Sequence, residues 1–160
     1  MILASIPHPM EQTRRKFLVF AAAVAATAAG LLRAGATWAQ SWNKAGFESK
    51  AVAEVMKSLG AAGAADSKDI AITAPDIAEN GAVVPIAVTS RIAGTESISI
   101  VAEKNPFPLA ATFDIANGSE AYVSTRIKMG ETSNVRAVVK AGGLYYTAAK
   151  EVKITIGGCG

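Results

Sequence analysis

The sequence is poor in the residues that most often carry chemistry. Its 160 residues include one histidine and one cysteine. His8 lies near the N-terminus, ahead of an apolar run, and Cys159 lies near the C-terminal end of the sequence. After that run the chain therefore has no serine–histidine–aspartate triad, no cysteine–histidine dyad and no structural zinc set. A disulfide framework is excluded as well, because it needs a second cysteine in the chain.

Other catalytic or cofactor-binding motifs are also missing. No glycine-rich phosphate loop follows a predicted strand and opens a helix. The carboxylate pairs Asp66 with Asp69 and Asp76 with Glu79 lie in polar stretches. Nothing nearby in the sequence would perturb these carboxylates, so we interpret them as solvated charges. We expect a protein that is not an enzyme and has no cofactor of its own.

The net positive charge comes from the start of the chain. The formal net charge is +3, yet from Gln40 onward there are 12 basic and 12 acidic residues. A nucleic-acid-binding domain needs a basic stripe on its folded surface. We therefore expect no nucleic-acid partner.

The basic residues at the start form part of an export signal. Arg14 and Arg15 precede Phe-Leu and an alanine-rich apolar run over residues 17–32. Paired arginines, a short apolar run and small residues after it are typical of a twin-arginine signal peptide. A membrane anchor is the alternative, but the run is shorter than the roughly 20 residues of a span and is broken by Gly30. The sequence predicts export to the periplasm, with no membrane attachment after cleavage.

The sequence leaves two alternatives for each end of this signal. Cleavage can follow Ala36 or Ala39, of which we favour Ala39, and translation can start at Met1 or Met10. The predicted division is a signal peptide over residues 1–39, a folded domain over 40–156 and a tail over 157–160.

One amphipathic helix is predicted at the start of the folded domain, over residues 43–59, with Gly60 as its stop. Its apolar residues recur at three- and four-residue steps and are Phe47, Ala51, Val52, Val55, Met56 and Leu59. Such a stripe packs on the core of its own domain or, as the alternative, forms a partner surface.

From Ile70 onward the apolar period changes to two, which predicts strands. These cover residues 70–74, 83–89, 98–102, 111–116, 121–129, 135–140, 144–149 and 152–156. Turn signals separate them at Asn80-Gly81, Asn105 to Pro108, Asn117-Gly118 and Gly142-Gly143. Short strands at this spacing with no helix between them predict an all-β fold, an immunoglobulin-like antiparallel β-sandwich.

Proline at position 85 interrupts one of these strands. Because proline cannot donate to a sheet ladder, the sequence predicts an edge strand or a bulge over residues 83–89. An edge there would let another chain pair with it.

The single cysteine is placed where no core can form around it. Cys159 is flanked by Gly157, Gly158 and Gly160, which have no side chains to shield the sulfur and which leave the backbone free. From the predicted end of the last strand the sulfur can reach on the order of 10 Å, at ~3.3 Å per residue. Such an arm can enter another protein's channel while the domain stays outside, as group carriers do.

The tail and several internal segments resemble the SoxY family, the sulfur carriers of the periplasmic thiosulfate-oxidising Sox system. The matching segments are the terminal Gly-Gly-Cys-Gly, residues 74–88 (APDIAENGAVVPIAV), 103–108 (EKNPFP) and 124–139 (STRIKMGETSNVRAVV). The family usually has one more glycine after this terminus, which the sequence lacks.

The resemblance implies that Cys159 holds thiosulfate-derived sulfur covalently while other proteins act on it. It implies a heterodimer with a SoxZ-like subunit that has no signal of its own. It also implies a haem-containing enzyme that attaches thiosulfate, a manganese hydrolase that releases sulfate and, in some systems, a molybdenum sulfane dehydrogenase. The cofactors belong to those enzymes.

A structural or adhesion β-sandwich whose tail cysteine forms an interchain disulfide is the alternative from another class. A thiol enzyme is disfavoured because no base accompanies the cysteine.

Overall fold

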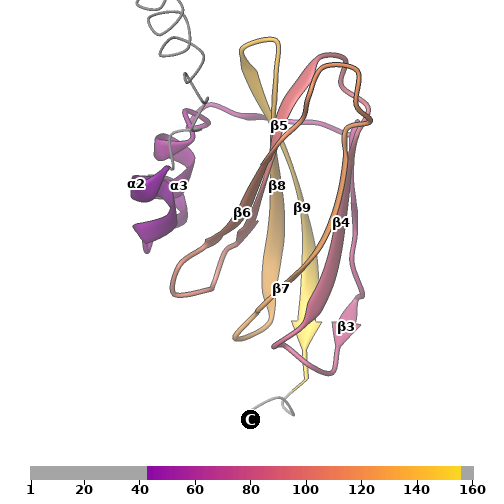
Figure 1. Ribbon diagram of the computed structural model, residues 1–160. Coiled ribbons are helices and arrows are strands. Elements are labelled where there is room, and N and C mark those ends of the chain that lie inside the picture. The colour runs from indigo at the N-terminus through magenta and orange to yellow at the C-terminus, as the bar shows by residue number, and fades with distance from the viewer. Residues whose placement is uncertain (1–42, 156–160) are drawn as a thin grey trace, which may run out of the picture. The chain divides into compact units, whose positions relative to one another are not determined.

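The computed structural model describes residues 43–155 as three stacked layers (Figure 1). Two short helices lie on one face of a six-stranded sheet, and a three-stranded sheet lies against its other face. The predicted signal peptide (1–39) and the cysteine tail (157–160) lie outside the described residues.

The six-stranded sheet has the order β1-β9-β8-β5-β6, with β3 also paired to β9. β1 and β3 run parallel to β9, and every other neighbouring pair in this sheet is antiparallel. Its strands are β1 (Ala65–Asp66), β3 (Ile77–Ala78), β5 (Thr95–Ala102), β6 (Leu109–Asp114), β8 (Ser133–Ala141) and β9 (Leu144–Ile154).

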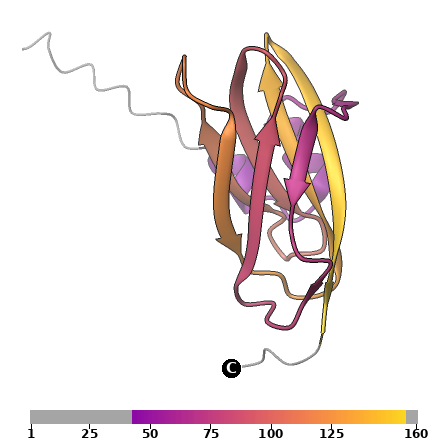
Figure 2. The same cartoon turned by 90° about the vertical axis from the view of Figure 1, so that its right-hand side faces the viewer.

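The three-stranded sheet is antiparallel and has the order β2-β4-β7. Its strands are β2 (Ile70–Thr73), β4 (Val84–Ser90) and β7 (Tyr122–Ile127). Figure 2 shows these three strands in front of the six-stranded sheet. The predicted β-sandwich is confirmed.

The main core lies between the sheets and follows from the period-two alternation. In β4, Val84, Ile86 and Val88 are buried, whereas Pro85 is exposed. Facing them from the other sheet are buried side chains of β5 and β8: Ile98, Ile100, Ala102, Val135, Ala137 and Val139.

A second core lies on the outer face of the six-stranded sheet, under helices α2 (Lys44–Glu48) and α3 (Val52–Ser58). Val55 of α3 is fully buried against Val101 and Val138, which point away from the main core. The helical stripe therefore packs on its own domain, as the sequence analysis expected, and is not a partner surface.

The prediction of one helix over residues 43–59 is wrong, because the chain turns at residues 49–51. The Ser49 hydroxyl donates to the Ala45 carbonyl (2.6 Å), and Ser49 itself is extended. Serine side chains compete with the backbone in this way and end helices. A Cβ at Gly46 would lie 2.7 Å from the Ser58 hydroxyl oxygen, so the glycine lets the two helices pack closely.

Two separate strands were predicted over residues 144–149 and 152–156. The predicted break between them is wrong, since β9 is one continuous strand that ends at Ile154. Lys150 has the same parity as the core residues Ala148 and Val152. Its ammonium nitrogen donates to the Ala74 carbonyl (2.6 Å) and pairs with Asp76 (3.0 Å). The aliphatic stem can therefore follow the core while the charge is satisfied at the margin of the sandwich.

The expectation of an edge strand or a bulge at residues 83–89 holds only in part, because β4 lies between β2 and β7 without a register shift, yet its first three residues are not paired with β2. Pro85 is tolerated because the pairing with β2 begins only at Ala87. At Pro85, β4 pairs with β7 alone. Over residues 87–89 no edge is free for another chain.

One predicted turn lies at the end of the sandwich opposite to the tail. Gly142 and Gly143 both have positive φ and join β8 to β9 in the hairpin turn that the sequence predicted. β9 runs from this turn to the opposite end of the domain, where the tail begins (Figure 1). Within residues 43–155, neither helix is long and apolar enough to cross a membrane.

Candidate functional site

The candidate site is the end of the sandwich from which the chain continues to Cys159. The cysteine lies outside the described residues, and the structure describes the chain that leads to it as far as Thr155. The strand registers place three loops at this same end: residues 79–83, 103–108 and 128–132.

The last described residues of β9 are held from both sides. The N–H of Thr155, the residue that follows β9, donates to the carbonyl of Ala78, the last residue of β3 (3.2 Å). The Ile154 N–H donates to the Thr132 hydroxyl (2.9 Å), in the loop before β8. Because successive residues are bonded to different segments, the chain leaves the domain from a fixed position. We call Ile154 and Thr155, with these two hydrogen bonds, the anchor.

The turn between β3 and β4 packs against this anchor. The Asn80 side-chain oxygen accepts from the Ala82 N–H (2.9 Å), and the Gly81 carbonyl accepts from the Met129 N–H (2.7 Å). A Cβ at Gly81 would lie 2.4 Å from the Met129 carbonyl oxygen. Glycine is therefore required here for a close approach of two backbones, and not for a positive φ.

Asn105 links the other two loops. Its amide nitrogen donates to the Lys128 carbonyl (2.7 Å), and its amide oxygen accepts from the Gly130 N–H (3.2 Å). The β5–β6 loop is thus fastened to the β7–β8 loop, which in turn contacts Gly81 and Ile154. The whole end of the domain forms one connected frame around the start of the tail.

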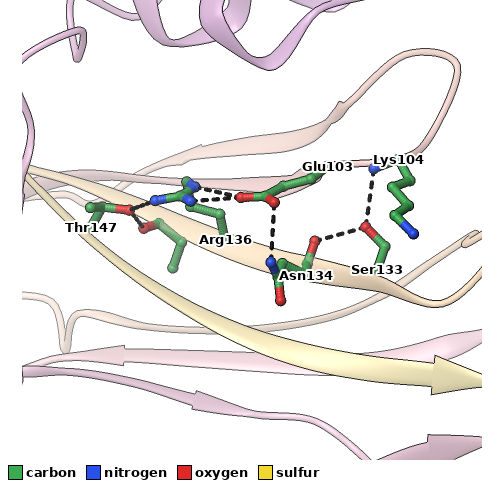
Figure 3. Close-up of polar contacts among 7 residues, drawn as sticks. Glu103, Lys104, Ser133, Asn134, Arg136 and Thr147 are labelled. Atoms are coloured by element: carbon green, nitrogen blue, oxygen red, sulfur yellow. Dashed lines mark hydrogen bonds and ion pairs between the residues drawn. The ribbon is translucent and has the colours of Figure 1, made fainter.

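A polar network lies on the outer face of the six-stranded sheet (Figure 3). One Glu103 carboxylate oxygen accepts from Arg136 Nε (2.8 Å) and Nη2 (2.7 Å), and the other accepts from the Asn134 amide (3.2 Å). Arg136 also approaches the buried hydroxyl of Thr147 (3.4 Å). Each of these charged groups already has a partner, so the network holds β5, β8 and β9 together and offers no unpaired acid or base.

Large apolar side chains are exposed at this end of the domain, Phe107 in the 103–108 loop and two that flank the 79–82 turn. Ile77 in β3 is 58% exposed, and Val83, just before β4, is 50% exposed. Each is next to a buried residue, Ala78 and Val84, and the alternation turns it outward. They flank the 79–82 turn on its two sides.

The acidic pairs that the sequence analysis interpreted as solvated are exposed: Asp66, Asp69, Asp76 and Glu79. Asp76 has one partner that the sequence did not indicate, the Lys150 ammonium group. Within residues 43–155, no three histidine, cysteine, aspartate or glutamate side chains come together as a metal site would require.

A shallow pocket of about 170 Å³ lies at the opposite end of the sandwich. Its lining comes from the loops around Gly94 and Gly118 and includes no charged residue. A ligand site normally combines apolar walls with placed polar or charged groups. We therefore do not assign the function to this pocket.

The length of the chain limits the distance between Cys159 and the anchor. Cys159 is the fourth residue after the bonded Thr155. Even a fully extended chain spans at most ~3.3 to 3.6 Å per residue, which limits the reach from Thr155 to about 14 Å. This is slightly more than the sequence analysis expected, because the described part of β9 ends at Ile154 and not at Ile156.

Comparison with known families identifies the chain. The model of the family described as sulfur oxidation protein SoxY matches residues 55–159, and so includes Cys159. The chain belongs to the SoxY family.

A solved structure supports this assignment, that of the sulfur carrier protein SoxY from Chlorobium limicola f thiosulfatophilum. It is 38% identical, with a TM-score of 0.61, and the match covers 71% of this chain and 99% of that one. A superoxide reductase (neelaredoxin) from Ignicoccus hospitalis is 17% identical with a TM-score of 0.48, over 57% of this chain and 83% of its own. That weaker likeness carries no functional argument. A search of the curated proteins gave no match.

The site of this SoxY-family chain thus combines residues that the sequence pointed to with others that it did not. Cys159 and its glycines were predicted from residue type, and they stay predictions, as do Arg14 and Arg15 of the signal. The anchor residue Thr132 was not predicted, since nothing in its local sequence distinguishes it. Asn105 lies in the 103–108 segment that resembles the family, which was a usable signal.

Proposed function

We propose that the chain carries thiosulfate-derived sulfur on Cys159 and presents it to partner enzymes. The observation that carries this proposal is the SoxY match over residues 55–159, which reaches the cysteine itself. Its structural relative is named a sulfur carrier protein. The anchored exit of β9 fits the same role, because it holds the base of a short arm.

The loading step is an oxidation. The Cys159 thiolate and the outer sulfur of thiosulfate form a sulfur–sulfur bond, and two electrons leave to the haem-containing enzyme. The product is a cysteine with a sulfur–sulfonate group attached. Cysteine holds such groups reversibly.

The release step is a hydrolysis and needs no oxidant. Water attacks the sulfonate sulfur, the bond between the two outer sulfur atoms breaks, and sulfate leaves with two protons. A persulfide stays on Cys159. In the proposed scheme the manganese hydrolase catalyses this step, and in some systems a molybdenum dehydrogenase then oxidises the sulfane sulfur.

The chain itself acts in this scheme as a carrier and not as an enzyme. A cysteine that has no base beside it in sequence is a weak nucleophile on its own. Carriers leave the chemistry and its cofactors to the proteins that they visit. Gly157, Gly158 and Gly160 leave the sulfur unshielded for this purpose.

The proposed working form is a heterodimer with a SoxZ-like subunit in the periplasm. Its support is the twin-arginine pattern at Arg14 and Arg15, which is typical of proteins exported after folding. A chain without a cofactor has no need to fold before export in order to load one. Carrying a partner without a signal gives such a need.

Intact-mass spectrometry of protein taken directly from thiosulfate-grown cells tests the carrier role. Because Cys159 is the only cysteine, we expect added sulfur and sulfonate species that disappear on reduction and are absent from Cys159→Ser. Only free thiol and symmetric disulfide dimer in the wild type would refute the proposal and favour a structural role for the cysteine.

A further inference from the structure

We propose that Ile77 and Val83 form a docking patch that contacts the apolar rim of the channel through which a partner enzyme receives the tail. This inference rests on the carrier function proposed above. It adds the surface of the domain that makes the contact and the chemistry of the surface that it meets. We call these two residues the exit patch.

The reach of the tail brings this end of the domain close to any site that Cys159 enters. Cys159 can lie at most about 14 Å from Thr155, whose N–H is bonded to Ala78. The depth to which the sulfur enters an enzyme is subtracted from this length, and a channel about as deep as the tail is long leaves none of it outside. The residues around Thr155 must then touch the channel mouth.

Ile77 and Val83 are the exposed large apolar side chains nearest to that point along the bonded framework. Ile77 is paired in register with Lys153 of β9, and Val83 follows the turn whose Gly81 approaches the Ile154 side chain. Ala82 and Pro85, on the same segment, are also exposed. Single exposed apolar residues are ordinary, but two that flank one turn at the start of the tail are not explained by the packing of the domain.

Charge does not select a partner at this end. The exposed residues around the exit patch carry both signs, with Glu79 and Glu131 against Lys128 and Lys153. A carrier that serves several enzymes gains from a contact that does not depend on one sign of charge. Two aliphatic side chains supply a small, weak and reversible contact, as an encounter between turnover steps requires.

The test compares two variants of the full-length carrier in complex with its subunit. Ile77→Thr with Val83→Thr keeps both β-branched shapes and removes the apolar surface. Leu144→Thr is the matched control, because Leu144 is 62% exposed and begins β9 at its far end. At ~3.3 Å per residue, ten residues of strand place it about 33 Å from Ile154.

The assay measures sulfate release from the thiosulfate-loaded carrier by the manganese hydrolase. We expect the double variant to raise the KM for the carrier about tenfold with little change in kcat, because the lost contact is made before the chemistry. The control should match the wild type. Alkylation of Cys159 by iodoacetamide should proceed at the wild-type rate in both variants.

An unchanged KM in the double variant, with normal release from the wild type, would overturn the docking patch and leave the carrier function intact. A wild-type carrier that releases no sulfate would instead refute the proposed function. Light scattering with size-exclusion chromatography decides one more case. If the double variant loses its subunit or a second copy of itself, the patch belongs to that interface and the inference is wrong.

Discussion

At the scale of single residues, the packing beside the end of β9 depends on the absence of a Cβ atom at Gly81. Gly81 has no side chain, and the Met129 backbone occupies the space where one would begin. The two residues also share a backbone hydrogen bond of 2.7 Å. One glycine therefore sets how closely the β3–β4 turn and the β7–β8 loop pack beside β9.

Alanine at Gly81 should lower the free energy of unfolding by about 2 kcal/mol, because the backbones must separate to admit the methyl group. Urea unfolding followed by circular dichroism measures this. Gly63→Ala is the control, since a Cβ there meets nothing within 4 Å. Equal loss of stability in the two variants would show that the close approach is not the cause.

Residue type also explains which part of the site the sequence could predict. Cys159 could be predicted because its chemistry depends on its residue type, and its glycines because they lack side chains. Thr132 and Lys150 matter only through partners that are far away in the sequence, Ile154 and Ala74. No local pattern contains such contacts, so only the folded chain identified them.

At the scale of elements, period-two strands were predicted well and short or linked elements poorly. Residues 135–140 alternate between core and outer face, and β8 follows that pattern. β1 and β3 are two residues long, which is too short to show an alternation of apolar and polar residues in the sequence. The helix was predicted as one piece because its stripe continues through the turn that Ser49 makes.

The end of the β8–β9 hairpin is tied to β5 by an ion pair. Lys140 Nζ lies 2.6 Å from Glu96 Oε2, and the Gly143 N–H donates to the other carboxylate oxygen (3.3 Å). The hydrogen bond from Lys140, followed by that from Gly143, lowers the pKa of Glu96. The same bond with Glu96 raises the pKa of Lys140.

This pair predicts a pH window for its contribution to stability. A carboxyl with a lowered pKa stabilises the fold above its unfolded pKa and loses this effect as the pH falls through the folded value. A lysine with a raised pKa stabilises the fold below its unfolded pKa and loses this effect as the pH rises through the folded value. The wild type should therefore exceed Glu96→Gln by a small, constant amount at neutral pH, and the gap should close at acidic and at strongly alkaline pH.

Urea unfolding of both proteins across pH measures the gap. Because both groups are exposed, it should also shrink in high salt. Glu120→Gln is the matched control, since within residues 43–155 no ion pair involves Glu120. A gap that persists unchanged at low pH would mean that the Glu96 charge is not its source.

At the scale of the whole molecule, the proposed export route makes a prediction about two proteins at once. If the folded carrier brings its SoxZ-like subunit through the membrane, Arg14→Lys with Arg15→Lys should leave both in the cytoplasm. The change keeps the charge and removes only the arginine pair. Immunoblots of periplasmic and cytoplasmic fractions measure the outcome. A subunit that still reaches the periplasm would show independent export and contradict this explanation of the signal.

The continuous β9 strand has a mechanical consequence. Force applied to the cysteine by a partner that grips it is transmitted along the axis of β9, which is paired with β8 from Leu144 to Val152 and with β3 at its end. Ladder hydrogen bonds lie across the strand direction, so a pull along the strand shears many of them together and does not open them one by one. The tail can thus be withdrawn from an enzyme under force while the domain that holds it stays folded.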